Sequence, residues 1–372
     1  MIYLDNAATT QPFPEVIAEM QDVLINVYGN PSSVYQLGRQ AKQKLNEARR
    51  MIAHSIGAKD SEIIFTSCGT ESNNTALYSL AYAQEKRHII STCIEHPSVM
   101  KVLKDLETKG FSVTYLPVDE HGIISLDDLE HAITSETSFA TIMAVNNEVG
   151  SIQPIEQIAE ILHRHHVFYH TDAVQAYGTL HFDMTQLPID MMSVSAHKIH
   201  GPKGIGFLYI RDNTPFKPFI LGGGQEQTQR SGTENLHNIV GFAKAVEMMN
   251  VSKRREHFNH LQHKFLSLLH ASKLDYELNG LEDTSKKSSK IINIWFKHIP
   301  SSKLLIQLDL KHVMVSAGSA CSAGSLKASP VLQCMYPSTP NRAIESIRLS
   351  FSEYNTEKDI ETLVEILKVI AI

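Results

Sequence analysis

Lys198 and Asp172 have side chains and positions that could serve one reaction together. Lys198 lies in SVSAHKIHGPKGIGFLYI (residues 193–210), between a strand-like apolar run and a turn rich in glycine and proline. Partial burial lowers the pKa of a lysine, and its uncharged amine can form a Schiff base with an aldehyde. Asp172, in HTDAVQAYG, ends another strand-like run. A pyridoxal phosphate enzyme needs both groups, a lysine for the aldehyde and a carboxylate for the pyridine nitrogen. A surface lysine in a turn and an aspartate cap are the alternatives for each residue taken alone.

The segment SCGTESNN (residues 67–74) offers a place for a phosphate group. It follows the strand-like run EIIFT and opens a helical pattern. The backbone amides of Gly69 and Thr70 would then lie at the positive end of a helix, where anions bind. An ordinary capping box between Thr70 and Asn73 is a compatible interpretation.

Three more polar residues stand beside these motifs. Ser195 and His197 flank Lys198 closely in the sequence and are candidate phosphate ligands. His96, in EHPS, follows another strand-like run, and it could stack on a cofactor ring or transfer protons. A single histidine is more often structural, so this role depends on the other motifs.

Cys321 stands in SAGSACSAGSL (residues 316–326), a run of small residues that contribute little to a core. A structural cysteine is usually buried among apolar neighbours, so this composition predicts a displayed thiol on a flexible loop. The other cysteines, Cys68, Cys93 and Cys334, are far apart and form no CxxC pair. We therefore expect free thiols rather than a disulfide framework or a zinc site. We expect Cys93 to be a small core residue and leave Cys334 undecided.

Helical and strand patterns alternate between about residues 40 and 245 and predict how these side chains are positioned. The strand-like runs include EIIFT, HIIST, FATIMAV, VFYHT and DMMSVS, and a polar cluster follows each of them. This βαβα order is typical of a largely parallel sheet covered by helices, in which ligands bind at the carboxyl ends of the strands. After about residue 245 the strand-like runs IINIWF and RLSF indicate a smaller α+β unit, completed by the N-terminal dozen residues.

Composition limits the classes of function. The chain has 372 residues, 42% of them hydrophobic, and a formal net charge of -6. This mild acidity argues against direct nucleic-acid binding or an anionic membrane as the main partner. The sequence has no apolar run near the ~18 residues of a membrane helix and no signal-peptide pattern, so we expect a cytoplasmic protein. HRHH (residues 163–166) is interpreted as a solvated helix end, and we expect no metal.

Ten motifs, in order, resemble the cysteine desulfurase family (NifS/IscS-like), within aminotransferase class V. They are YLDNAATT, GNPSS, GTESNN, EHPSV, NNEVGSIQPI, HTDAVQ, SAHKIHGPKG, RSGTEN, GSACSAG and SIRLSF. The resemblance implies the α/β fold of fold-type I pyridoxal phosphate enzymes, with a mainly parallel seven-stranded sheet. It implies a large cofactor-binding domain over residues 13–250. A smaller α+β domain would comprise residues 1–12 and 251–372 and carry a mobile loop around Cys321.

The resemblance also assigns roles around the cofactor ring. Lys198 would bind the pyridoxal 5'-phosphate aldehyde, Asp172 would pair with the pyridinium, and His96 would stack over the ring and help in proton transfer. Gln175 and Asn147 would contact the phenolic oxygen side of the cofactor and the substrate.

The phosphate would be bound by residues of two chains. Gly69, Thr70, Ser195 and His197 would supply one side, and Thr233 of RSGTEN would come from a partner subunit. The resemblance therefore implies a homodimer.

The reaction implied is the conversion of L-cysteine to L-alanine. Arg348 would bind the substrate carboxylate, which suits its planar fork. Cys321, as a thiolate, would take the substrate sulfur as a persulfide and pass it to an acceptor protein, an iron–sulfur scaffold or a tRNA-thiolation enzyme. A selenocysteine lyase or another class V aminotransferase-like enzyme is the alternative, because it would use the same lysine and aspartate. A non-catalytic scaffold is a weaker alternative.

Overall fold

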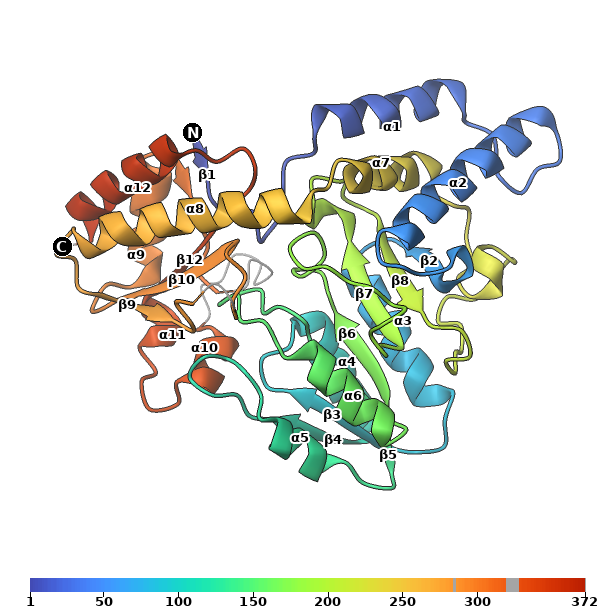
Figure 1. Cartoon of the computed structure of the whole chain (residues 1–372), viewed down its shortest axis with the longest axis horizontal. Helices are drawn as coiled ribbons and strands as arrows, with labels where there is room; N and C mark the ends of the chain where they lie inside the picture. The colour runs from blue at the N-terminus through green and yellow to red at the C-terminus, as the bar shows by residue number, and fades with distance from the viewer. Residues whose placement is uncertain (284–285, 319–327, 372) are drawn as a thin grey trace.

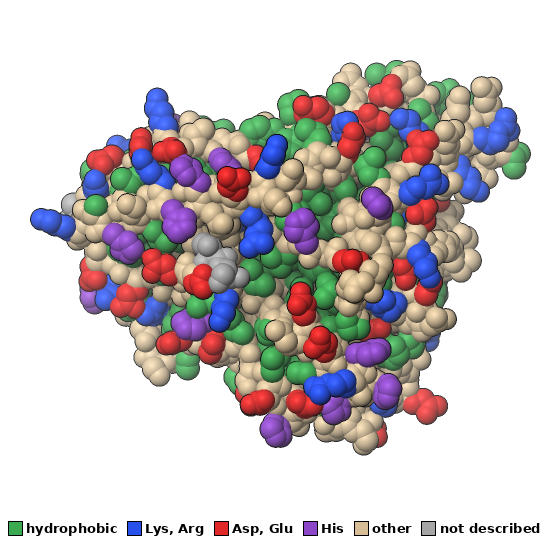
Figure 2. Space-filling view, in the orientation of Figure 1, with side chains coloured by type: hydrophobic (Ala, Val, Ile, Leu, Met, Phe, Trp, Pro, Cys, Tyr) green, Lys and Arg blue, Asp and Glu red, His purple; other side chains and the backbone are tan. Residues whose placement is uncertain are grey.

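The computed structural model describes residues 1–283, 286–318 and 328–371, and Cys321 lies outside the described residues. Figure 1 shows two lobes of unequal size, with both chain termini in the smaller lobe. Within the described part of the chain, no helix combines the length and apolar character needed to cross a membrane. On the face shown in Figure 2, basic and acidic side chains are interspersed rather than separated into regions of one sign.

A seven-stranded sheet forms the centre of the larger lobe, which confirms the predicted α/β fold class. The strand order is β2-β8-β7-β6-β5-β3-β4. Their bounds are β2 Ile63–Thr66, β3 His88–Thr92, β4 Ser112–Leu116, β5 Thr137–Thr141, β6 Phe168–Asp172, β7 Met191–Ser195 and β8 Gly206–Ile210. β8 runs antiparallel to both of its neighbours, whereas β7, β6, β5, β3 and β4 pair in parallel. Consecutive strand residues point to opposite faces, so each strand contributes to two apolar layers.

Helices cover both faces of this sheet. On one face, α3 (Gly69–Tyr82) and α4 (Pro97–Thr108) pack against residues such as Ile89 and Leu208. On the other, α2 (Gln36–His54), α5 (Leu126–Ala132), α6 (Ile155–Arg164) and α7 (Leu236–Glu247) pack against residues such as Ile90 and Tyr209, together with α1 (Pro14–Asn26). The helical stripe at Ala41, Leu45, Ala48 and Ile52 is fully buried, as its period of about 3.6 residues predicts. Short 3-10 turns are η1 (Asp60–Glu62), η2 (Ala196–Lys198) and η3 (Glu226–Thr228).

The smaller lobe has its own apolar core and two small sheets. β9 (Tyr276–Asn279), β10 (Ile291–Phe296) and β12 (Ser346–Ser350) form an antiparallel sheet with β10 in the middle. β1 (Ile2–Tyr3) pairs with β11 (Val313–Met314), so the start of the chain joins its C-terminal part. The helices of this lobe are α8 (Val251–His270), α9 (Ser301–Asp309), α10 (Pro330–Met335), α11 (Arg342–Glu345) and α12 (Glu357–Ile370).

A disulfide joins Cys93 and Cys334, so the expectation of free thiols is wrong for this pair. Cys93 directly follows β3, Cys334 lies in α10, and their Cα atoms are 6.4 Å apart. Both side chains are half-buried at the edge of a cluster that includes Ile94 and Leu332, so Cys93 is not simply a core residue. The two cysteines are 241 positions apart in the sequence, and no local spacing could reveal a pairing that the fold creates.

Candidate active site

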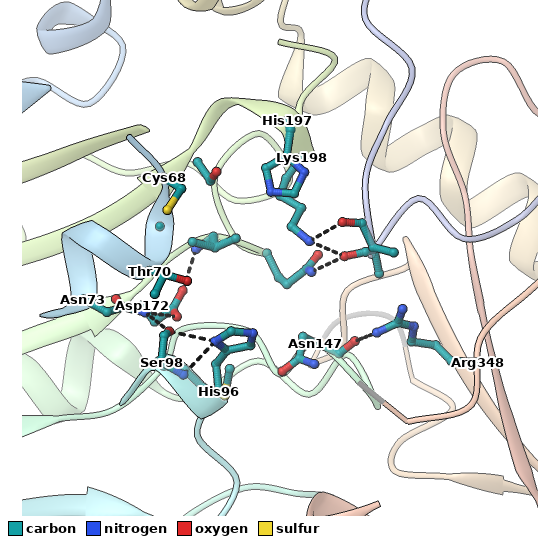
Figure 3. Close-up of a pocket in the computed structure, with 17 residues that line it drawn as sticks. Cys68, Thr70, Asn73, His96, Ser98, Asn147, Asp172, His197, Lys198 and Arg348 are labelled. Carbon is teal, nitrogen blue, oxygen red and sulfur yellow. Dashed lines mark hydrogen bonds between the residues drawn. The ribbon is translucent and has the colours of Figure 1, made fainter. Parts of the chain in front are cut away.

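A cavity of about 150 Å³ lies at the carboxyl ends of β6 and β7, and it gathers most of the predicted site residues. The predicted residues that line it are Gly69, Thr70, His96, Asn147, Asp172, Gln175, Ser195, His197, Lys198 and Arg348. Figure 3 shows that these side chains come from both lobes. Thr233 lies elsewhere, in a separate surface depression with Arg230 and Glu234. Cys321, the remaining predicted catalytic residue, lies outside the described residues.

Lys198 ends the η2 turn that directly follows β7. Its Nζ donates to the carbonyl oxygens of Ala7, at 2.5 Å, and Ala8, at 2.8 Å (Figure 3). These carbonyls belong to the N-terminal segment, which passes between the two lobes. Gln175 Nε2 also donates to the Ala7 carbonyl, at 2.8 Å. The segment therefore forms a wall of the cavity, a role that the sequence patterns alone did not predict.

Asp172 ends β6 and directs a fixed carboxylate toward the cavity. The residue is 4% exposed. One carboxylate oxygen accepts from the Nδ2 of Asn73 at 2.7 Å, and the other accepts from the backbone N–H of Val174 at 2.9 Å. Asn73 lies on α3, whose N-cap is Cys68 without a side-chain cap, so the capping box with Thr70 and Asn73 is wrong. Asn73 instead orients Asp172, and its position in GTESNN was the only sequence signal for it.

His96 caps the N-terminus of α4. Its Nδ1 accepts from the backbone N–H of Ser98 at 3.1 Å and lies 2.7 Å from the Ser98 hydroxyl. The proton of the neutral ring therefore sits on Nε2. Burial lowers the pKa of His96, the charge of Asp172 opposes this shift, and the charge of Lys198 adds to it. The ring is thus held in its uncharged, basic form near neutral pH.

One end of the cavity has the features of an anion site. Gly69 begins α3, which is long enough to present a positive N-terminus. A Cβ at Gly69 would lie 2.7 Å from Val174 Cγ2, so a side chain there would close the approach to the helix end. The hydroxyl of Ser195 is buried and has no hydrogen-bond partner among the described residues.

His197 lies at the same end of the cavity, with its Nδ1 3.1 Å from the hydroxyl of Thr9. Burial, followed by the positive charges of Lys198 and Lys290, lowers the pKa of His197 to about 3. The ring is therefore neutral and can donate one hydrogen bond but adds no charge.

Arg348, on β12, brings a buried guanidinium from the smaller lobe. The residue is 1% exposed. Its Nη2 donates to Asp5 Oδ1 at 2.9 Å, and its Nη1 donates to the carbonyl oxygen of Asn147 at 2.7 Å. Its Nε is buried and has no hydrogen-bond partner among the described residues. A cavity-lining cation with N–H groups left over suits a carboxylate ligand.

These residues fit pyridoxal phosphate. The cavity contains a lysine amine for an aldehyde and a buried carboxylate for a pyridine nitrogen. It also has a helix N-terminus beside an orphaned serine hydroxyl for a phosphate. Asn73, Ser98 and Met143 line it as well, and residue patterns did not single them out as ligands.

Comparisons with known proteins agree with this geometry. The aminotransferase class V family matches residues 2–363. A cysteine desulfurase of Trichormus azollae is 43% identical over 371 residues, covering 99% of this chain and 92% of that protein. A solved NifS-like protein is 36% identical with a TM-score of 0.92, covering 99% of this chain and 98% of its own. SspA, solved in complex with cysteine, is 35% identical with a TM-score of 0.84, and the match covers 96% of this chain and 100% of the SspA chain. The chain therefore belongs to the aminotransferase class V family and, within it, to the cysteine desulfurases.

Proposed function

We propose that this chain uses pyridoxal 5'-phosphate to convert L-cysteine to L-alanine and delivers the sulfur, as a persulfide on Cys321, to an acceptor protein. The observation that carries the proposal is the convergence of Lys198, Asp172 and Arg348 on one cavity. The complex of the similar SspA with cysteine supports the choice of substrate. A selenocysteine lyase would share this cavity, so the alternative is decided by experiment.

The residues that would hold the cofactor divide by its parts. Lys198 would hold the aldehyde carbon, Asp172 the pyridine nitrogen, and His96 the ring face, with Gln175 and Asn147 near the phenolic oxygen. The residues for the phosphate would be Gly69, Thr70, Ser195 and His197. When bound, the cofactor supplies an electron sink for the bonds at the substrate's α-carbon.

The chain's own groups would then bind and move protons. The guanidinium of Arg348 binds the substrate carboxylate through the N–H groups that remain after its hydrogen bonds to Asp5 and Asn147. The amine of Lys198 takes the α-proton of the substrate. His96, neutral and fixed through Nδ1, is the second group placed to transfer a proton.

Cys321 would carry out the sulfur transfer. Its thiolate forms a bond to the substrate sulfur as the carbon–sulfur bond breaks, and the bonding electrons of that bond remain with the carbon fragment. That fragment is protonated and leaves as alanine. The sulfur remains on Cys321 as a persulfide, and a thiol of the acceptor then takes the terminal sulfur atom.

We further propose a homodimer in which Thr233 completes the phosphate site of the partner subunit. Thr233 lies in a depression outside the cavity of its own chain, which supports a role toward a second copy. We also propose a cytoplasmic location, as the sequence predicts. Residues 13–250 would form the cofactor-binding domain, and residues 1–12 with 251–372 the smaller one; the two apolar cores support this division.

The test is to incubate the enzyme with L-cysteine and a reductant and to measure alanine and sulfide. Wild-type protein should produce both, and Cys321→Ala should produce neither at the wild-type rate. Ser322→Ala, a matched change in the same segment, should retain activity. Sulfur transfer by Cys321→Ala at the wild-type rate would refute the persulfide step. Lys198→Ala should lose the visible absorbance of the bound cofactor, and its retention would refute that assignment. A higher rate with L-selenocysteine and none with L-cysteine would favour the lyase.

A further inference from the structure

We propose that Lys290 is a positioning residue for Lys198: its buried Nζ holds the Lys198 carbonyl, and its positive charge opposes protonation of the Lys198 nitrogen. The inference rests on the proposed attachment of the cofactor to Lys198. Lys290 directly precedes β10, is 5% exposed, and donates from Nζ to the carbonyl oxygen of Lys198 at 2.9 Å. Its own carbonyl oxygen accepts from the backbone N–H of Phe351 at 2.9 Å. The smaller lobe therefore fixes the point from which this side chain reaches the η2 turn.

The surroundings of Lys290 are rich in cations, and the nearby carboxylate is already engaged. Glu353 accepts from Arg254 and lies 2.8 Å from the Nε2 of His200. The charged and titratable groups that face Lys290 or line the small cavity beside it are Tyr177, His197, Lys198, His200, Arg254, Arg348 and Glu353. Burial, followed by the charge of Arg254, lowers the pKa of Lys290 to about 7. A lysine interior to the protein is therefore poised to change charge near neutral pH.

Lys290 and Lys198 influence each other's protonation. The charge of Lys198 is one of the causes that lower the pKa of Lys290. Electrostatic coupling between two groups is reciprocal, so a proton on Lys290 disfavours a proton on the Lys198 nitrogen. Lys203 is also a cation near this turn, but its side chain is exposed and its charge is screened by solvent. Lys290 therefore tests the effect of a buried charge on Lys198, and Lys203 is the exposed control.

The experiment is a pH titration of the visible absorbance of the cofactor-loaded enzyme without cysteine. Lys290→Met and Lys290→Gln remove the charge, so the pH midpoint of the absorbance change should rise, by about one pH unit for loss of a buried like charge. Lys290→Arg keeps a charge at every accessible pH, so its midpoint should fall below that of the wild type. Lys203→Met should leave the midpoint unchanged.

Opposite shifts of Lys290→Met and Lys290→Arg support the inference, because a purely structural loss would not depend on the sign of the charge change. No shift in either variant, or shifts in the same direction, would overturn it. Lys290→Gln keeps a donor for the Lys198 carbonyl, so a wild-type midpoint in that variant would overturn the electrostatic part. Thermal unfolding of each variant identifies misfolded protein. A wild-type enzyme without any visible band would instead refute the proposed function.

Discussion

Arg348→Ala should raise the KM for cysteine far more than it lowers kcat. The guanidinium lines the cavity and makes one hydrogen bond each to Asp5 and Asn147, so three of its five N–H groups remain. If one of these remaining N–H groups binds the substrate carboxylate, the variant loses one charge-assisted hydrogen bond, worth ~1.5–3 kcal/mol. At ~1.4 kcal/mol per factor of ten, this predicts a rise in KM of about 10- to 150-fold. Arg348→Lys keeps the charge but loses the planar fork, so its KM should lie between those of the wild type and Arg348→Ala.

The same substitution should also destabilise the fold. Asp5, which is half-buried, would lose its partner, and the buried Asn147 carbonyl would lose its donor at a cost of about 1–3 kcal/mol. A control is therefore needed that destabilises without touching the cavity. Arg342 meets this need, because it pairs with Glu277 and packs its guanidinium 4.5 Å from the Trp295 ring centroid in the smaller lobe.

The assay measures alanine formation against cysteine concentration for Arg348→Ala, Arg348→Lys and Arg342→Ala, with the unfolding midpoint of each protein. Arg342→Ala should lose stability while its KM stays at the wild-type value. An unchanged KM in Arg348→Ala would refute the assignment of Arg348 to the substrate carboxylate. Equal rises in KM for Arg348→Ala and Arg342→Ala would show that the effect is one of stability alone.

Three further predictions concern buried titratable groups and the disulfide. Burial lowers the pKa of His96, so the midpoint of the acidic limb in the pH profile of kcat/KM should lie below the ordinary histidine range. His96→Gln should remove that limb and lower kcat by about 100-fold. An acidic limb that persists in the variant would belong to another group. Burial raises the pKa of Glu95 from 4.5 to about 8, so this group contributes stability below pH 4.5 that is lost as pH rises through 8. The stability of Glu95→Gln relative to the wild type should therefore increase with rising pH. A difference between the two denaturation midpoints that stays constant with pH would contradict this. Reduction of the Cys93–Cys334 bond, or Cys93→Ser, should lower the melting temperature, because the chain-entropy model assigns up to ~5 kcal/mol to a cross-link this long; equal melting temperatures would show that the bond does not stabilise the protein.

The parallel sheet was predictable because local patterns encode it. Each strand carries an apolar run followed by a polar cluster, and the α2 stripe has helical spacing. The reversed direction of β8 has no such signal, since a strand reads the same in either direction. Two successive helices, α7 and α8, are separated between Glu247 and Val251, where Asn250 caps the second helix.

Site residues could be predicted where the reaction requires a particular side-chain chemistry. They could not be predicted where a residue acts by positioning another residue that it contacts only in the folded chain. Lys198, Asp172 and Arg348 have side chains whose chemistry is specific, and all three line the cavity. Asn73 and Lys290 act through the residues they contact, and those contacts join α3 to β6 and the smaller lobe to the η2 turn. Such partners depend on tertiary structure, which residue types at a given spacing do not encode.

The N-terminal segment explains why the cavity needs both lobes. The backbone N–H of Ala7 donates to the hydroxyl of Ser350 on β12 at 2.7 Å, while its carbonyl oxygen accepts from Lys198 and Gln175 of the larger lobe. Asp5, in the same segment, accepts from Arg348. One short stretch of backbone thus contacts the groups proposed for the aldehyde and for the substrate carboxylate. The distance between those two groups is therefore set when the first residues of the chain pack against the last strand, so assembly of the site depends on the pairing of segments nearly 350 residues apart.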